Sequence, residues 1–187
     1  MPPKVKITKE DIIRTTVELV RANGEHAINA RAVAAALDCS TQPIFSNFAT
    51  MEELRAAVLY AAYCLYADFL KKEAESGRYP EYKAYGMAYV RFAMEEKELF
   101  KLLFMRDRTG EDLTPSPDFE KSVEVIMKAN SISREKAMLM HLEIWTCVHG
   151  IGAMIVTSFL TFDLDTVSNM ISDVYHGIRT RHLSEGK

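Results

Sequence analysis

The segment Ser40–Phe48, STQPIFSNF, carries the side chains best suited to recognition chemistry in this chain. A glutamine amide can form two hydrogen bonds with an adenine edge, and threonine or proline can contact a thymine methyl group. Ile44 and Phe48 lie four residues apart, so on a helix both face inward and the polar residues face out. The outward positions are Thr41, Gln42, Pro43, Ser46 and Asn47. A helix with such a face fits the DNA major groove, so the segment indicates base readout.

A second helix and a tight turn are expected to position this segment. Asn29 can cap a helix that begins at Ala30, because its side-chain oxygen accepts a backbone N–H of the open first turn. Asp38–Cys39 then interrupts the apolar spacing, and Ser40 is the expected cap of the next helix, with Pro43 in its first turn. The pattern predicts a helix-turn-helix. Two core helices joined by a polar turn are the alternative interpretation of the same spacing.

Capping boxes mark the starts of the helices on either side. Thr8 with Asp11 predicts the start of a first helix that ends at Asn23. Thr50 with Glu53 is a second capping box and opens a long fourth helix. The apolar positions expected along that helix are Leu54, Val58, Ala61, Leu65 and Phe69.

The rest of the chain also predicts helices. Pro80 begins a helix that runs on to Met105, a charged loop follows at residues 106–116, and Pro117 begins a helix to about Ala129. No alternation of the β type appears anywhere, so the chain is expected to be all-α.

Two long helices are expected at the carboxyl end, from Ser133 to about Leu160 and from Leu164 to about Leu183. Both are apolar on more than one side, which favours burial against a second copy of the chain. Packing within one copy is the alternative. The candidate residues of a homodimer interface are Gly152, Ala153, Val156, Phe159, Ile171, Val174, Tyr175 and Ile178.

The helical body is rich in aromatic residues and methionine, with a few histidines. Such a composition is usual for a small-molecule pocket, and plain core packing is the alternative. The candidate pocket residues are Tyr63, Tyr66, Met87, Phe92, Phe100, Phe104, Met138, His141, Trp145 and His149. No metal site or cofactor is expected, because Cys147 points away from the two histidines that flank it along the helix. No nucleophile elbow, phosphate loop or acid pair indicates catalysis.

The net charge of −3 argues against a non-specific nucleic-acid binder. Residues 1–50 hold six Lys/Arg and five Asp/Glu, whereas the remaining residues hold 17 and 21. The amino-terminal part is therefore only slightly basic. Specific DNA binding would depend on docking geometry and on the doubled contacts of a dimer.

The cysteines and the apolar segments indicate in which cellular compartment the protein is expected. The three cysteines lack disulfide or metal spacing, and MPPKVKITKED lacks the apolar core of a signal peptide, so a cytoplasmic location is expected. The stretch Ile144–Phe162 has no charged residue and approaches the length of a membrane span. Its glycine, serine, threonine and histidine residues favour a buried helix at a subunit interface instead, so no membrane partner is expected.

From about Ile7 to Val58 the chain resembles the amino-terminal domain of the TetR family of transcriptional regulators. The resemblance is carried by NARAVA from Asn29, STQPIFSNF from Ser40 and MEEL from Met51. It implies base contacts in the second helix of the motif, a DNA contact at the start of the first, and phosphate contacts around them. The implied DNA-binding residues are Thr8, Arg31, Ser40, Thr41, Gln42, Pro43, Phe45, Ser46 and Asn47. Farther on, WTCVHG from Trp145 resembles the Trp-x-x-x-His-Gly pattern of one carboxyl-terminal TetR subgroup.

Three residues depart from the family pattern. Phe45 replaces the usual tyrosine and lacks a hydroxyl for phosphate, and Met51 replaces the usual lysine and lacks a charge for the salt-dependent part of affinity. Asp38 replaces the usual glycine, which requires a site that accepts a left-handed residue. These departures keep a second hypothesis open, an all-helical small-molecule binding protein or enzyme whose helix-turn-helix no longer binds DNA.

We expect a helix-turn-helix DNA-binding domain at residues 1–50 and a larger helical ligand-binding and dimerisation bundle at residues 51–187. The expected partners are double-stranded DNA with a near-palindromic operator, a small hydrophobic ligand and a second copy of the chain. The expected function is that of a non-enzymatic homodimeric transcriptional repressor that the ligand releases from its operator.

Overall fold

The computed structural model describes residues 7–110 and 117–184, and over these ranges the chain is all-α, as the sequence predicts. The described residues form two compact units. Unit 1 holds the residues up to Ala67 together with Glu96–Arg106, and unit 2 holds Asp68–Glu95 together with the residues from Asp107 onward.

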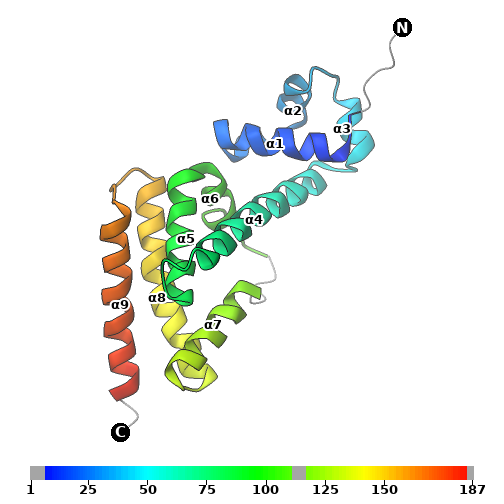
Figure 1. Cartoon of the computed structure of the whole chain (residues 1–187). Coiled ribbons are helices and arrows are strands. Elements are labelled where there is room, and N and C mark those ends of the chain that lie inside the picture. Colours follow the sequence, from blue (N-terminus) through cyan, green and yellow to red (C-terminus); the bar gives the residue numbers. More distant parts are fainter. Residues whose placement is uncertain (1–6, 111–116, 185–187) are drawn as a thin grey trace. The chain divides into compact units, whose positions relative to one another are not determined.

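Unit 1 contains the helix-turn-helix. Its elements are α1 (Lys9–Asn23), the 3-10 turn η1 (Glu25–Ala27), α2 (Ala30–Ala36), α3 (Gln42–Asn47), the first part of α4 (Met51–Glu75), and α6 (Lys97–Phe104). Figure 1 shows α2 and α3 as two short helices beside α1. Its fully buried residues include Ile12, Val20, Val33, Ile44, Phe48, Leu54 and Leu99.

Local hydrogen bonds explain where the first two helices begin. The Thr8 side chain accepts the Asp11 backbone N–H, and the Asp11 carboxylate accepts the Thr8 N–H, so the predicted capping box is confirmed. The Asn29 side chain accepts the Ala32 N–H at 2.9 Å, which confirms the predicted cap of α2. Asp38 has a φ of +49°, so the left-handed position expected there does hold an aspartate.

The third and fourth helices differ from expectation in detail. α3 begins at Gln42 with Thr41 before it, so the prediction that Ser40 caps this helix was wrong. Along α4 the buried positions are Leu54, Val58, Ala62, Tyr66 and Leu70. The predicted positions Ala61, Leu65 and Phe69 are only half-buried, because the buried stripe continues in steps of four along the helix.

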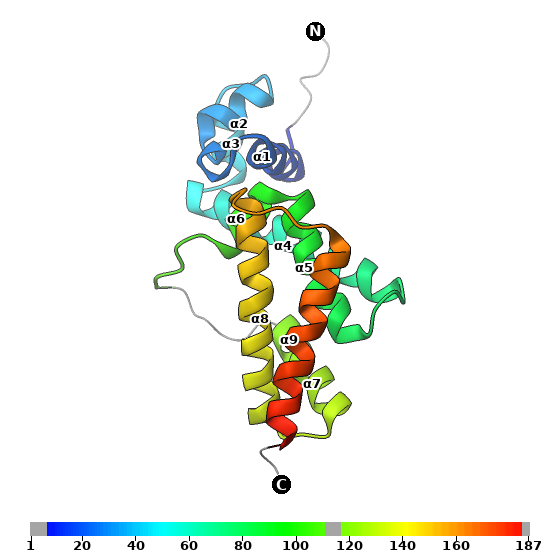
Figure 2. The ribbon, with the colours of Figure 1, turned by 90° about the vertical axis from the view of Figure 1, so that its left-hand side faces the viewer.

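Unit 2 is a bundle that includes α5 (Glu81–Glu95), α7 (Pro117–Asn130), α8 (Arg134–Val156) and α9 (Leu164–Ser184). α8 packs on α5, α7 and α9, and Figures 1 and 2 both show α8 and α9 side by side. One core cluster joins Val123 and Ile126 of α7 to Ala137 and Met140 of α8.

Two helix boundaries in this half of the chain were predicted incorrectly. The expected continuous helix from Pro80 to Met105 is broken at Glu96, whose φ of −125° and ψ of 52° are not helical. α8 ends at Val156 rather than near Leu160, because Ser158 takes a left-handed φ of +55°.

By length and composition α8 could cross a membrane, and 44% of its apolar window is buried inside the protein. The core helix of a globular bundle has the same properties, and α8 packs on three other helices of unit 2.

Candidate nucleic-acid interface and ligand-binding core

The outer side of α3 is polar and accessible. Gln42 and Ser46 are exposed, while Ile44 and Phe48 are fully buried against unit 1. Three further candidate residues, Thr41, Pro43 and Asn47, are half-buried at the edges of this face. The two inward anchors thus hold the short helix so that its polar residues point away from the core.

Hydrogen bonds within α3 rank its polar side chains as base readers. The Ser46 hydroxyl donates to the Gln42 carbonyl at 2.9 Å, and the Asn47 amide donates to the Pro43 carbonyl at 2.8 Å. The Ser46 hydroxyl proton and one of the two Asn47 amide hydrogens are therefore used within the helix. The Gln42 amide has no such partner among the described residues, so it keeps both its donor and its acceptor for a base edge.

The other candidate DNA contacts surround α3. Arg31 is exposed in the first turn of α2, and Ser40 is exposed in the turn before α3. Phe45 is 50% exposed, which leaves a large aromatic face in solvent beside Gln42 and Ser46. The Thr8 hydroxyl donates to the Asp11 carboxylate at 2.9 Å as well as capping α1.

The candidate pocket residues fall into both units. In unit 1, Phe104 makes ring contacts with Tyr66 at 5.2 Å and with Phe100 at 5.1 Å, and Tyr63 lies 6.4 Å from Tyr66. In unit 2 the candidates are Met87, Phe92, Met138, His141, Trp145 and His149.

Two tyrosine–histidine pairs connect α5 to α8 inside unit 2. The Tyr82 hydroxyl lies 2.8 Å from Nδ1 of His141, and the Tyr89 hydroxyl lies 2.8 Å from Nδ1 of His149. Trp145 stacks on His149 with ring centroids 5.1 Å apart. The tyrosines were not among the predicted site residues, because each lies 59 or 60 positions from its histidine and no local pattern joins them.

Burial fixes the protonation state of these pairs. It lowers the pKa of His141 to about 4, and it also lowers the pKa of His149. Burial likewise raises the pKa of Tyr89 and that of Tyr82, and the nearby Tyr175 raises the pKa of Tyr82 further. At neutral pH both imidazoles are therefore uncharged, and each Nδ1 can accept a hydrogen bond from the tyrosine hydroxyl. This part of the core offers aromatic surface with neutral polar groups.

The candidate dimer residues differ widely in exposure. Gly152, Val156 and Ile171 are buried within one copy of the chain, whereas Phe159 is 75% exposed. The half-buried candidates are Ala153, Val174, Tyr175 and Ile178, of which the last two pack on the α7–α8 core cluster. Large apolar residues that the sequence did not single out, Leu139 and Leu142, are 48% and 45% exposed on α8.

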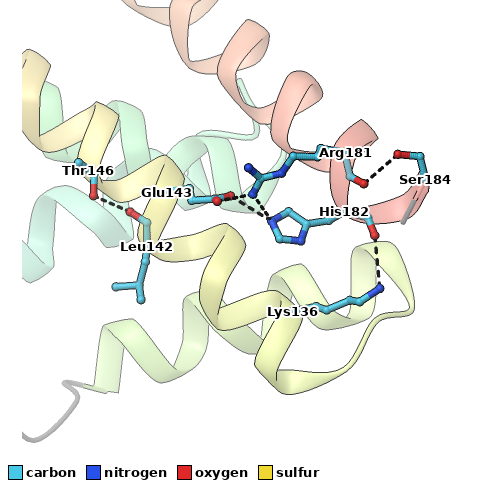
Figure 3. A network of polar contacts seen from close by, with 7 residues as sticks. All are labelled: Lys136, Leu142, Glu143, Thr146, Arg181, His182 and Ser184. Carbon is cyan, nitrogen blue, oxygen red and sulfur yellow. Dashed lines mark hydrogen bonds and ion pairs between the residues drawn. The ribbon is translucent and has the colours of Figure 1, made fainter. Parts of the chain in front are cut away.

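A polar network fixes the end of α9 against α8 (Figure 3). Nε2 of His182, which is only 4% exposed, lies 3.0 Å from a Glu143 carboxylate oxygen, and Arg181 pairs with the same carboxylate. Lys136 of α8 donates to the His182 carbonyl at 3.5 Å. Burial alone would raise the pKa of Glu143, but the hydrogen bonds from His182 and Arg181 outweigh it and lower that pKa. The network therefore holds the two helices in register.

Groups of ligating side chains are absent among residues 7–110 and 117–184: no three His, Cys, Asp or Glu side chains gather as a metal site would require. Cys39, Cys64 and Cys147 are free thiols.

Comparison with known proteins places the fold. No family model matches the sequence, and no curated protein matches it. The crystal structure of a TetR-like transcriptional regulator from Rhodococcus sp. RHA1 matches with a TM-score of 0.68 and 13% sequence identity. The match covers 94% of this chain and 96% of that one. At this identity the likeness shows the fold, which is the all-α fold of TetR-like regulators, and it does not extend to the Trp-x-x-x-His-Gly subgroup.

Proposed function

We propose that this chain, which has a TetR-like fold, is a DNA-binding transcriptional regulator that acts as a homodimeric repressor. The observation that carries the proposal is the face of α3, where Gln42 and Ser46 are exposed while Ile44 and Phe48 are buried. A helix held in this way can enter a major groove with its polar residues toward the base edges.

The outer face of α8 and α9 supports the dimer. Gly150 of α8 and Gly177 of α9 both have open space where a Cβ would lie, so another helix can approach closely at either position. Large exposed apolar side chains, Leu139 and Leu142, lie on the same helix as Gly150. A dimer formed through this face would carry two α3 helices, one for each half-site of a near-palindrome.

The tyrosine–histidine pairs of unit 2 support a small hydrophobic ligand. They supply uncharged hydrogen-bonding groups among aromatic rings, a composition that suits an apolar molecule with a few polar atoms. Such a ligand shifts the protein toward a DNA-releasing state only if it binds that state more tightly.

Within unit 1 an ion pair joins the residue before α6 to α1. Glu96 is the single residue between α5 and α6, and Arg21 of α1 holds its carboxylate through two bonds of 2.9 and 2.7 Å. The Glu96 hydrogen bonds raise the pKa of Arg21, consistent with a charge-assisted pair. A displacement of Glu96 would therefore act directly on α1.

Selection of binding sites from a library of random DNA duplexes tests the proposal. The purified protein should enrich a near-palindromic sequence and bind it in a salt-dependent manner, while sedimentation should give a dimer. Failure of any sequence to become enriched would contradict the DNA-binding function and favour the small-molecule binding alternative.

A further inference from the structure

We infer that Lys9 is a contact to the DNA backbone, placed at the end of α3 by two interactions within unit 1. The inference rests on the proposed function and extends it to a residue outside the helix-turn-helix motif.

Two contacts fix the position of the Lys9 ammonium. Nζ lies 4.6 Å from the centroid of the Phe48 ring, and it donates to the Glu53 carboxylate at 2.9 Å. Phe48 is the residue directly after α3, and Glu53 belongs to the first turn of α4. The charge is therefore held where the start of α1, the end of α3 and the start of α4 meet.

The Lys9 ammonium lies beside α3, which has no charged side chain of its own. The sequence of α3, QPIFSN, contains no charged residue, and α4 begins with the uncharged Met51. A large share of DNA affinity comes from cations that neutralise phosphates, so an uncharged DNA-binding helix needs cations beside it. Arg31 of α2 is exposed, and Lys9, whose side chain is 45% exposed, places a cation in contact with the end of α3.

The ammonium of Lys9 retains hydrogen-bonding capacity for a phosphate. An ammonium group has three donors, and the Glu53 oxygen takes one of them. The contact with the Phe48 ring is made by the charge over the ring face and restrains the flexible side chain. A restrained cation loses less conformational entropy when it binds.

Glu53 holds the Lys9 ammonium in place, and its negative charge also competes with a DNA phosphate for that ammonium. Its other oxygen accepts the Ala49 backbone N–H at 2.8 Å, so the carboxylate is fixed at the start of α4. The hydrogen bond from Lys9 is the first cause that lowers the pKa of Glu53, followed by the bond from Ala49, so the carboxylate is charged at neutral pH. This negative charge competes with a phosphate for Lys9.

The two residues should therefore affect DNA binding with opposite signs. Lys9→Ala removes the phosphate contact, whereas Glu53→Gln keeps an acceptor for the Ala49 N–H and removes the competing charge. If the Lys9–Glu53 pair served only the fold, both substitutions would weaken unit 1 and both would reduce binding.

The experiment measures binding by fluorescence anisotropy on the duplex that the wild-type protein enriches from a random library, between 50 and 300 mM salt. For Lys9→Ala we expect the slope of log Kd against log salt to become smaller by about 1 per protomer, with affinity about tenfold weaker per protomer at 0.1 M salt. Glu53→Gln should tighten binding. Base preference should be the same in all variants, because phosphate contacts do not distinguish bases.

Arg14→Ala is the matched control. Arg14 is also an α1 cation paired with an acid, its side chain is 73% exposed, and it lies about 140° around the helix from Lys9. It should leave the slope unchanged. Thermal unfolding of each variant identifies any loss of fold, and Lys9→Arg should keep the wild-type slope.

The outcomes separate the inference from the proposed function. If the wild-type protein enriches no sequence, the function fails and Lys9 has no such role. If it binds DNA but Lys9→Ala leaves the slope unchanged, or Arg14→Ala lowers it equally, the inference alone is overturned. A loss of affinity in Glu53→Gln equal to that in Lys9→Ala would also overturn it.

Discussion

α3 and α8 are built for contact in different ways. α3 has six residues, and two buried side chains, Ile44 within it and Phe48 directly after it, hold it against unit 1. α8 has 23 residues and packs on α5, α7 and α9, and two of its histidines, His141 and His149, form hydrogen bonds with tyrosines of α5. A reading surface can thus be specified by neighbours in sequence, whereas a binding core depends on which helices meet.

The largest effect is expected from a substitution on the outer face of α8. Leu142→Glu should convert the proposed dimer to monomers, because a two-fold interface on this face would bring two carboxylates together in apolar surroundings, where each loses its water and repels the other. Analytical ultracentrifugation measures the change. Tyr60→Glu on α4, where the tyrosine is 70% exposed, is the matched control and should leave the dimer intact. A dimeric Leu142→Glu variant would place the interface elsewhere.

The stability of unit 1, which contains the helix-turn-helix, should be independent of the stability of the helical bundle of unit 2. Ile44→Ala should destabilise unit 1 by about 2–5 kcal/mol, because Ile44 is fully buried. Circular dichroism follows both units in urea, whereas fluorescence of Trp145, the single tryptophan, follows α8. The unfolding transition of unit 1, seen by circular dichroism, should move to lower urea concentration. The transition seen by Trp145 fluorescence should not move. Equal shifts of both signals would show that the two regions unfold together.

The buried histidine of α8 should make the stability of the bundle depend on pH. The pKa of His141 is about 4 in the folded chain and near the ordinary 6.5 when unfolded, so its neutral form favours folding. Stability should be complete above pH 6.5 and fall toward pH 4, by up to about 1.4 kcal/mol per pH unit. Urea unfolding of His141→Gln over the same range should have a shallower dependence. Parallel curves for the two proteins would contradict the prediction.

Base readout should depend most on Gln42. Gln42→Ala should relax the preference at one base position by about 1–3 kcal/mol, because the amide keeps a donor and an acceptor for a base. Binding-site selection with the variant measures the loss. An unchanged selected sequence would remove Gln42 from the reading surface.

The smallest expected effect is that of Ser46→Ala. The Ser46 hydroxyl already donates to the Gln42 carbonyl, and the residue is exposed, so stability should change by no more than about 0.5 kcal/mol. The selected sequence should change less than in Gln42→Ala. A larger change in base preference would reverse the ranking of these two residues.

Sequence reasoning predicted the elements whose causes are local. The caps at Thr8, Asn29 and Ser133 each bond a backbone N–H three residues ahead, so the residues that start each helix are adjacent in the chain. The orientation of α3 follows in the same way from Ile44 and Phe48. The bounds of α7 and α9 were also predicted closely, because Pro117 and Leu164 begin uninterrupted helical patterns.

The break at Glu96 and the register of the α4 stripe required the tertiary structure. Nothing beside Glu96 in the sequence announces that Arg21, 75 residues away, binds it. Ala62, Tyr66 and Leu70 are as helical and apolar in context as their neighbours, and only the packing of other helices selects them for burial.

By itself, the sequence determined an all-α chain with a helix-turn-helix whose polar side faces out, because caps, turns and four-residue spacing act over a few residues. Only the tertiary structure decided which tyrosine meets which histidine and that Lys9 reaches Glu53, 44 residues away. Those pairings are set by how helices pack, and helix packing depends on surfaces contributed by distant parts of the chain.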